Sequence, residues 1–142
     1  YLINSNINLL ILYFKFCSMR NILIVGAGKS SPYLIKYLLD KSQEQNLYLN
    51  ITDVTIDHLL HHKKNNRCTV STINILDDKE REEYLLKNDI IISMLPARLH
   101  MILANSCLKL KKNLITASYV SDEMRGINTD VKDRNLIFLN AQ

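Results

Sequence analysis

Short apolar runs of strand length alternate along the chain with segments in which apolar residues recur at helical spacing. This alternation is typical of βαβ units and predicts an α/β domain built on a parallel sheet. The predicted strands span residues 21–25, 47–52, 68–75, 89–94, 113–116 and 136–139. The predicted helices span residues 31–41, 55–63, 97–110 and 122–132, and a further helix is opened by the acidic pair at 77–78. Six strands connected in this way fit one doubly wound parallel sheet, the Rossmann fold, with strand order 3-2-1-4-5-6 and right-handed crossovers.

The first predicted strand runs directly into a glycine turn, Gly26-Ala27-Gly28, and then into a predicted helix. The first glycine allows a tight turn with positive φ, and the second lets the backbone approach a pyrophosphate without a Cβ in the way. The helix offers unpaired N–H groups and its positive dipole end to the phosphates. Ser31 occupies the third position of this fingerprint, where a small residue can replace glycine. The residues expected to bind the pyrophosphate are Gly26, Gly28, Lys29, Ser30 and Ser31.

An acidic residue, Asp53, comes directly after the second predicted strand. A carboxylate at this position can accept hydrogen bonds from both hydroxyls of an adenosine ribose, and it would repel a 2′-phosphate. Asp53 would also suit the N-cap of the predicted helix at 55–63, and the two roles can coexist. The glycine turn and Asp53 together predict an adenine dinucleotide, with NAD as the expected cofactor and NADP as the alternative.

Composition places the chain with ordinary folded proteins, since 47% of its 142 residues are hydrophobic, 23% are charged and the net charge is +4. The length corresponds to one domain, which is short for an enzyme with separate cofactor and substrate domains. The basic residues are scattered and do not alternate with aromatic residues, so we expect no nucleic-acid partner. Three widely spaced cysteines argue against a disulfide framework or a zinc site and favour a reduced, cytoplasmic protein.

Residues 1–18 precede the regular pattern and contain an apolar run at 9–14 that is too short to span a membrane. The segment also lacks the flanking charge and the cleavage site of a signal peptide. Because Met19 stands immediately before the first predicted strand, we interpret residues 1–18 as a non-native upstream leader. The dinucleotide-binding domain is then expected at residues 19–142, without membrane association. An additional amphipathic helix or edge strand is the alternative for residues 1–18.

Four histidines could carry chemistry. His58, His61 and His62 have a helical spacing that could present two imidazoles to a metal ion, but the two lysines that follow would repel a cation. We therefore expect a solvated polar face there and no metal site. His100 is expected one turn into the fourth helix, near the carboxyl ends of the first and fourth strands, where core, capping and catalytic roles are all open. The acidic residues between 77 and 83 are expected on an exposed helix face.

The turns after the fourth and fifth predicted strands contain the most specific residue patterns of the chain. The first reads Ser93-Met94-Leu95-Pro96-Ala97-Arg98-Leu99-His100, and the second contains Ser118-Tyr119-Val120-Ser121. Both follow the carboxyl end of a strand, where open α/β sheets bind their ligands. Together with the glycine turn, these patterns resemble the saccharopine dehydrogenase family of glutamate-forming saccharopine reductases, and the resemblance covers residues 19–142.

The resemblance implies an NAD(P)-linked oxidoreductase of lysine metabolism that interconverts saccharopine with glutamate and 2-aminoadipate 6-semialdehyde. It implies a nicotinamide over the ends of the fourth and fifth strands, with Leu95, Pro96 and Ser118 beside the cofactor. Tyr119 then lies in the active-site region and is the catalytic candidate. Members of the family that use NADPH tend to carry an arginine at the end of the second strand, so Asp53 favours NAD.

The family also implies a large substrate and dimerisation domain after the sixth strand, with a small amino-acid substrate and a homodimer formed through that domain. Because this domain is missing from the sequence, we expect the chain to bind cofactor but to be inactive alone. Two other functions stay open. One is a carboxynorspermidine-type synthase of polyamine metabolism, and the other is a non-catalytic NAD-sensing module similar to the regulatory domains of potassium transporters.

Overall fold

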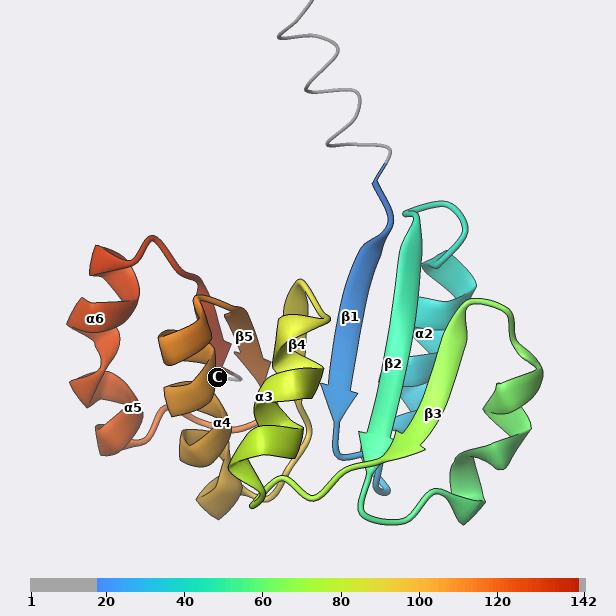
Figure 1. Ribbon diagram of the computed structural model, residues 1–142, viewed down its shortest axis with the longest axis horizontal. Helices are drawn as coiled ribbons and strands as arrows, with labels where there is room; N and C mark the ends of the chain where they lie inside the picture. The colour runs from blue at the N-terminus through green and yellow to red at the C-terminus, as the bar shows by residue number, and fades with distance from the viewer. Residues whose placement is uncertain (1–17, 141–142) are drawn as a thin grey trace, which may run out of the picture.

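The six predicted strands form one sheet. The computed structural model describes residues 18–140, so the leader expected at residues 1–18 lies outside the described residues apart from Ser18. The strands are β1 (Arg20–Val25), β2 (Leu47–Asp53), β3 (Cys68–Thr72), β4 (Ile90–Ser93), β5 (Asn113–Thr116) and β6 (Phe138–Asn140). All neighbouring strands are parallel, and their order β3-β2-β1-β4-β5-β6 confirms the predicted topology (Figure 1). The strand order reverses between β1 and β4, and such switch points are where these sheets bind ligands.

Helices cover the sheet on both faces. On one face lie α2 (Pro32–Lys41) and the 3₁₀ helix η1 (Asp57–Lys64). The other face is covered by α3 (Asp78–Leu86), α4 (Ala97–Leu110) and α5 (Asp122–Gly126), and α5 is followed by α6 (Asn128–Asp133) (Figure 1). No helix within residues 18–140 is long and apolar enough to cross a membrane.

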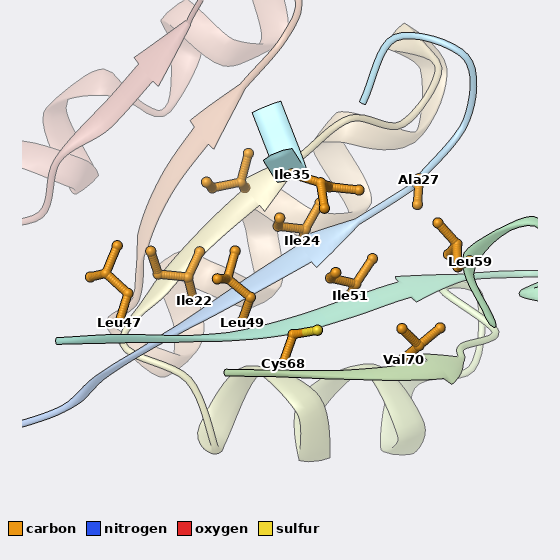
Figure 2. Packing of buried hydrophobic residues seen from close by; sticks show 11 residues of the cluster. Ile22, Ile24, Ala27, Ile35, Leu47, Leu49, Ile51, Leu59, Cys68 and Val70 are labelled. Carbon is orange, nitrogen blue, oxygen red and sulfur yellow. The ribbon is translucent and has the colours of Figure 1, made fainter. Parts of the chain in front are cut away.

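The side chains of β1 alternate between two hydrophobic cores. Ile22 and Ile24 belong to the core beneath α2, which Figure 2 shows, whereas Leu23 and Val25 belong to the core beneath α3 and α4. All four side chains are buried. Full burial of one such side chain stabilises the fold by about 1.5–3 kcal/mol. The strand that leads into the glycine turn is therefore held firmly from both sides.

Two elements between β2 and α3 differ from the prediction. The segment expected as a regular helix at 55–63 is the 3₁₀ helix η1, which begins with an i→i−3 bond from the Leu59 N–H to the Ile56 carbonyl oxygen (2.8 Å). Strand β3 ends at Thr72 instead of residue 75, because its last bond to β2 runs from the Ile73 N–H to the Asp53 carbonyl oxygen and β2 itself ends there. Ile73 and Ile75 then continue into the core beneath α3 and α4.

The C-terminal part also differs from its prediction in detail. The helix expected at 122–132 is divided into α5 and α6 after Gly126, a residue with low helix propensity. Strand β6 begins at Phe138 instead of residue 136. The Leu136 N–H bonds to the Val131 carbonyl oxygen (3.0 Å), and this bond closes the end of α6 around Asn135, whose φ is +55°. The Leu136 N–H is thereby bonded at the end of α6 and does not join the sheet.

The two described cysteines, Cys68 and Cys107, are buried free thiols, and Cys17 lies outside the described residues. Burial raises the pKa of the Cys107 thiol to about 12, so this side chain is an uncharged part of the core.

Arg81 is a buried cation in α3. Of the acidic residues expected on an exposed face, Asp77, Asp78 and Glu83 are exposed, whereas Glu80 and Glu82 are half-buried. The Arg81 guanidinium donates to the Ile75 carbonyl oxygen (2.7 Å), to the Ser106 hydroxyl on α4 (2.8 Å) and to Asp78 (2.6 Å). These bonds fix the loop after β3 against two helices. Ile75 lies in that loop and lines the cavity described next.

Candidate functional site

A cavity of about 580 Å³ opens at the carboxyl ends of β1, β2 and β4, at the switch point of the sheet. Its apolar walls come from the loop after β3 and from the start of α4. Of the nine residues predicted to bind the cofactor, six line this cavity: Gly26, Gly28, Ser30, Asp53, Leu95 and Pro96.

The glycine turn is pressed against the turn that follows β4. Gly26 has a φ of +90°, and a Cβ added to it would lie 3.0 Å from the carbonyl carbon of Met94. Gly28 differs, because a Cβ there would meet no atom within 4 Å and would extend into open space. The first glycine is thus required by the fold, and the second leaves the turn accessible to a ligand.

Ser31 closes the glycine turn from within. Its side chain is buried, and its hydroxyl donates to the Gly28 carbonyl oxygen (2.8 Å). It stands at the N-cap position of α2 with Pro32 next, but its side chain accepts no bond from the helix amides. A direct contact of the Ser31 side chain with the cofactor stays a prediction.

Both carboxylate oxygens of Asp53 accept backbone hydrogen bonds, and one of these bonds holds the glycine turn. One oxygen accepts a hydrogen bond from the Ala27 N–H (2.7 Å), and the other accepts one from the Val54 N–H (2.6 Å). The alternative role as a helix N-cap is wrong, because the N-cap of η1 is Ile56. A carboxylate can accept about four hydrogen bonds. Asp53 can therefore still accept from a ribose hydroxyl in the cavity.

His58 fixes the same turn from the other side. Its Nε2 lies 2.8 Å from the Ala27 carbonyl oxygen, so Asp53 and His58 together hold the N–H and the C=O of Ala27. Sequence reasoning missed this contact, because it joins residues far apart in the chain and no local pattern marks it.

The other two histidines of η1, His61 and His62, line a second cavity of about 400 Å³ together with Lys29 and Ser31. Burial and the neighbouring His61 lower the pKa of His62. His58 and His61 are exposed, in agreement with the predicted polar face. Within residues 18–140, no three His, Cys, Asp or Glu side chains are grouped so that they could hold a metal ion.

His100 is a buried residue that ties α4 to the end of β4. Its Nδ1 lies 2.8 Å from the Ser93 hydroxyl, and both side chains are buried. Burial lowers the pKa of His100, so the imidazole is neutral near pH 7. The Ser93 carbonyl oxygen also accepts from the Ala117 N–H (3.0 Å), which joins the turns after β4 and β5. Of the three roles left open for His100, the geometry therefore favours the core role.

The two predicted residues after β5 lie away from the cavity. The Tyr119 side chain is 79% exposed, and neither Tyr119 nor Ser118 is among the described residues that line the cavity. The carbonyl oxygen of Ser118 accepts a long bond from the Thr116 hydroxyl (3.5 Å). The catalytic role of Tyr119 and the cofactor contact of Ser118 stay predictions.

Arg98, at the second position of α4, lines the same cavity as Asp53 and was not predicted as a site residue. The available signal is its place two residues after Pro96, within the Ser93–His100 pattern that follows the carboxyl end of a strand. An arginine in the first turn of a helix meets the positive end of the helix dipole, which makes the position electrostatically unfavourable unless an anion lies nearby.

Comparisons with known proteins show the family to which the chain is related. The family model described as saccharopine dehydrogenase NADP binding domain matches residues 22–139. Mitochondrial alpha-aminoadipic semialdehyde synthase from Mus musculus is 28% identical over 126 residues, which cover 86% of this chain and 13% of that protein. Saccharopine dehydrogenase (NADP+, L-glutamate-forming) from Saccharomyces cerevisiae is 21% identical over 121 residues, which cover 85% of this chain and 26% of that protein.

Solved structures show the same fold. Apo histidine-tagged saccharopine dehydrogenase (L-Glu forming) from Saccharomyces cerevisiae superposes with a TM-score of 0.75 at 21% identity, over 85% of this chain and 26% of that one. Apo scyllo-inositol dehydrogenase from Lactobacillus casei superposes with a TM-score of 0.63 at 18% identity, over 87% of this chain and 36% of that one. The present chain thus spans about a third or less of each of these proteins.

The sheet, its switch point and the glycine turn define a dinucleotide-binding domain of the Rossmann class. The match over residues 22–139 shows further that the chain belongs to the family of saccharopine dehydrogenase NADP-binding domains. The predicted fold, family and NAD(P) cofactor class are thereby confirmed.

The two glycines of the turn should respond differently to the same substitution. Gly26→Ala should lower the free energy of unfolding by about 1–3 kcal/mol, because alanine is strained at positive φ and its Cβ would collide with the Met94 backbone. Gly28→Ala should change stability by less than about 0.5 kcal/mol and should weaken dinucleotide binding. Urea unfolding and NADPH titration of both variants measure these effects. Equal loss of stability in the two variants would contradict this account of the turn.

His100 should make stability depend on pH. Its pKa in the folded state lies below the ordinary value of 6.5, so its contribution is complete above pH 6.5 and is lost as the pH falls through the lowered pKa. The free energy of unfolding should therefore decline between pH 7 and about pH 5. In His100→Asn, which keeps a polar partner for Ser93, this decline should be smaller. His62 should contribute to the same decline, because its pKa is lowered as well, and His62→Asn measures that separate contribution. An unchanged pH profile in His100→Asn would disprove the assignment.

Proposed function

We propose that this chain is the cofactor-binding part of an NAD(P)-linked oxidoreductase that interconverts saccharopine with glutamate and 2-aminoadipate 6-semialdehyde, in lysine metabolism. The observation that carries the proposal is the family match over residues 22–139, together with a cavity that six of the predicted cofactor-binding residues line. The proposal includes a small amino-acid substrate and a homodimer formed through parts of the protein outside this sequence.

The residues of the cavity suit the successive parts of a dinucleotide. The open backbone at Gly28 and the start of α2 suit the pyrophosphate, since helix amides and the helix dipole favour anions. Apolar side chains of the loop after β3, Ile73 and Ile75, suit an adenine ring. Asp53 lies at the end of β2 and can accept from a ribose hydroxyl. The nicotinamide is then expected over the ends of β4 and β5.

A bound dinucleotide would supply the hydride acceptor for oxidation of the secondary amine of saccharopine to an imine, which water would then hydrolyse. The chain's own contribution is to bind and orient the cofactor. We assign no proton transfer to His100, because it is buried and already hydrogen-bonded to Ser93. The candidate acid–base groups are then Tyr119 and residues of a further domain. The relatives extend well beyond the part that this chain matches, which supports acid–base residues in a further domain.

Asp53 should contribute to dinucleotide binding. We expect Asp53→Ala to weaken NADH binding by about 1–3 kcal/mol, because the ribose and the Ala27 N–H both lose a charged acceptor. Fluorescence titration of the 142-residue chain with NADH measures the change. Asp57→Ala in η1 is the matched control, since Asp57 is exposed and does not line the cavity. If both variants bind NADH as the wild type does, Asp53 is not a ribose contact.

The proposed reaction should require more than this chain. The 142-residue chain should bind NADPH but show no oxidation of saccharopine, followed at the absorbance of the reduced nicotinamide. A longer protein that contains this domain should oxidise saccharopine with NAD(P)+ and release glutamate. If that protein instead forms carboxynorspermidine by reductive amination, or binds the dinucleotide and turns over neither substrate, the proposed reaction is wrong although the cofactor site is correct.

A further inference from the structure

Arg98 is the one cation that lines the cavity among residues 18–140. It is exposed, and within this part of the chain its guanidinium takes part in no hydrogen bond or ion pair. Other arginines of the chain are engaged: Arg81 is bound on three sides, and Arg125 is paired with Asp122 (3.5 Å). Arg98 therefore brings an uncompensated positive charge to the edge of a cavity that is otherwise mostly apolar.

The cavity also has one carboxylate among the described residues that line it, Asp53. Both oxygens of Asp53 accept backbone amides, from Ala27 and Val54. Two aligned N–H dipoles offset part of the negative charge of this side chain. An additional phosphate near Asp53 is then repelled less than a carboxylate free of partners would repel it.

We propose that Arg98 binds the 2′-phosphate of NADP, so that this cavity accepts the phosphorylated dinucleotide although an acid ends β2. The inference rests on the proposed function, because it assumes that the adenosine part of the cofactor occupies this cavity. A guanidinium offers a planar pair of N–H donors that matches two phosphate oxygens. The exposed position keeps the phosphate hydrated at the rim, while the apolar walls take the adenine.

Lys29 is the competing cation, and the geometry disfavours it. Lys29 lines the second cavity, beside His61 and His62, and does not line the cavity that contains Asp53. Asp53, the expected ribose contact, and Arg98 line the same cavity. Lys29 does not line the cavity that contains Asp53. A 2′-phosphate on a ribose held at Asp53 is therefore within the space that Arg98 lines.

The experiment compares two nucleotides that differ only in the 2′-phosphate, adenosine 5′-monophosphate and adenosine 2′,5′-bisphosphate. Isothermal titration of the 142-residue chain should give tighter binding of the bisphosphate by roughly tenfold, the lower end for a charge-assisted hydrogen bond because the site is exposed. Arg98→Ala should remove this difference and leave binding of the monophosphate unchanged. Arg98→Lys should keep part of it, and Arg125→Ala, on α5, is the matched arginine control. The preference should also shrink as salt is added.

Three results would overturn the inference, and they are distinguishable from failure of the proposed function. The first is equal binding of the two nucleotides by the wild type. The second is an Arg98→Ala variant that loses affinity for both nucleotides alike. The third is loss of the preference in Lys29→Ala and not in Arg98→Ala. If the wild type binds neither nucleotide nor NADPH, the proposed cofactor site itself is wrong, and the inference is rejected with it.

Discussion

The close contact between two turns is the constraint on which the rest of this site depends. The glycine turn after β1 and the turn after β4 meet at the switch point, where a Cβ on Gly26 would lie 3.0 Å from the Met94 carbonyl carbon. The two turns can meet only because β1 and β4 are hydrogen-bonded neighbours and because the residue after β1 has no side chain. The cavity opens beside this contact, at the carboxyl ends of β1, β2 and β4.

Polar residues around this contact hold the two turns in place through hydrogen bonds within the protein. Asp53 and His58 hold the two polar groups of Ala27, and Ser93 with His100 holds the start of α4. Hydrogen bonds of this kind contribute about 0.5–1.5 kcal/mol each, and those to a charged group contribute more. Their larger effect is geometric, because a preformed turn does not have to be ordered when a cofactor binds.

The sequence predicted the fold well, since the spacing of apolar runs fixes strand number and the glycine turn identifies β1. It predicted six residues that line the cavity because these lie in turns directly after strands, and parallel strands end at one edge. What could not be predicted depends on contacts between distant segments. Examples are the Ala27–His58 bond, the buried Ser93–His100 pair and the presence of Arg98 and Asp53 in one cavity. The element ends that were wrong, at β3 and β6, were decided by where the neighbouring strand or helix stopped offering partners.

The two amide bonds of Asp53 also bear on how a cofactor preference can change over evolution. Asparagine has only one acceptor oxygen in its side chain, so replacement of Asp53 by asparagine leaves the backbone N–H of either Ala27 or Val54 without its acceptor. Arg98 makes no such hydrogen bond within the described residues, so its substitution disturbs no contact that holds the turn. Substitutions at the start of α4 can therefore alter the dinucleotide preference of this domain with less disturbance of the glycine turn than substitutions at the end of β2.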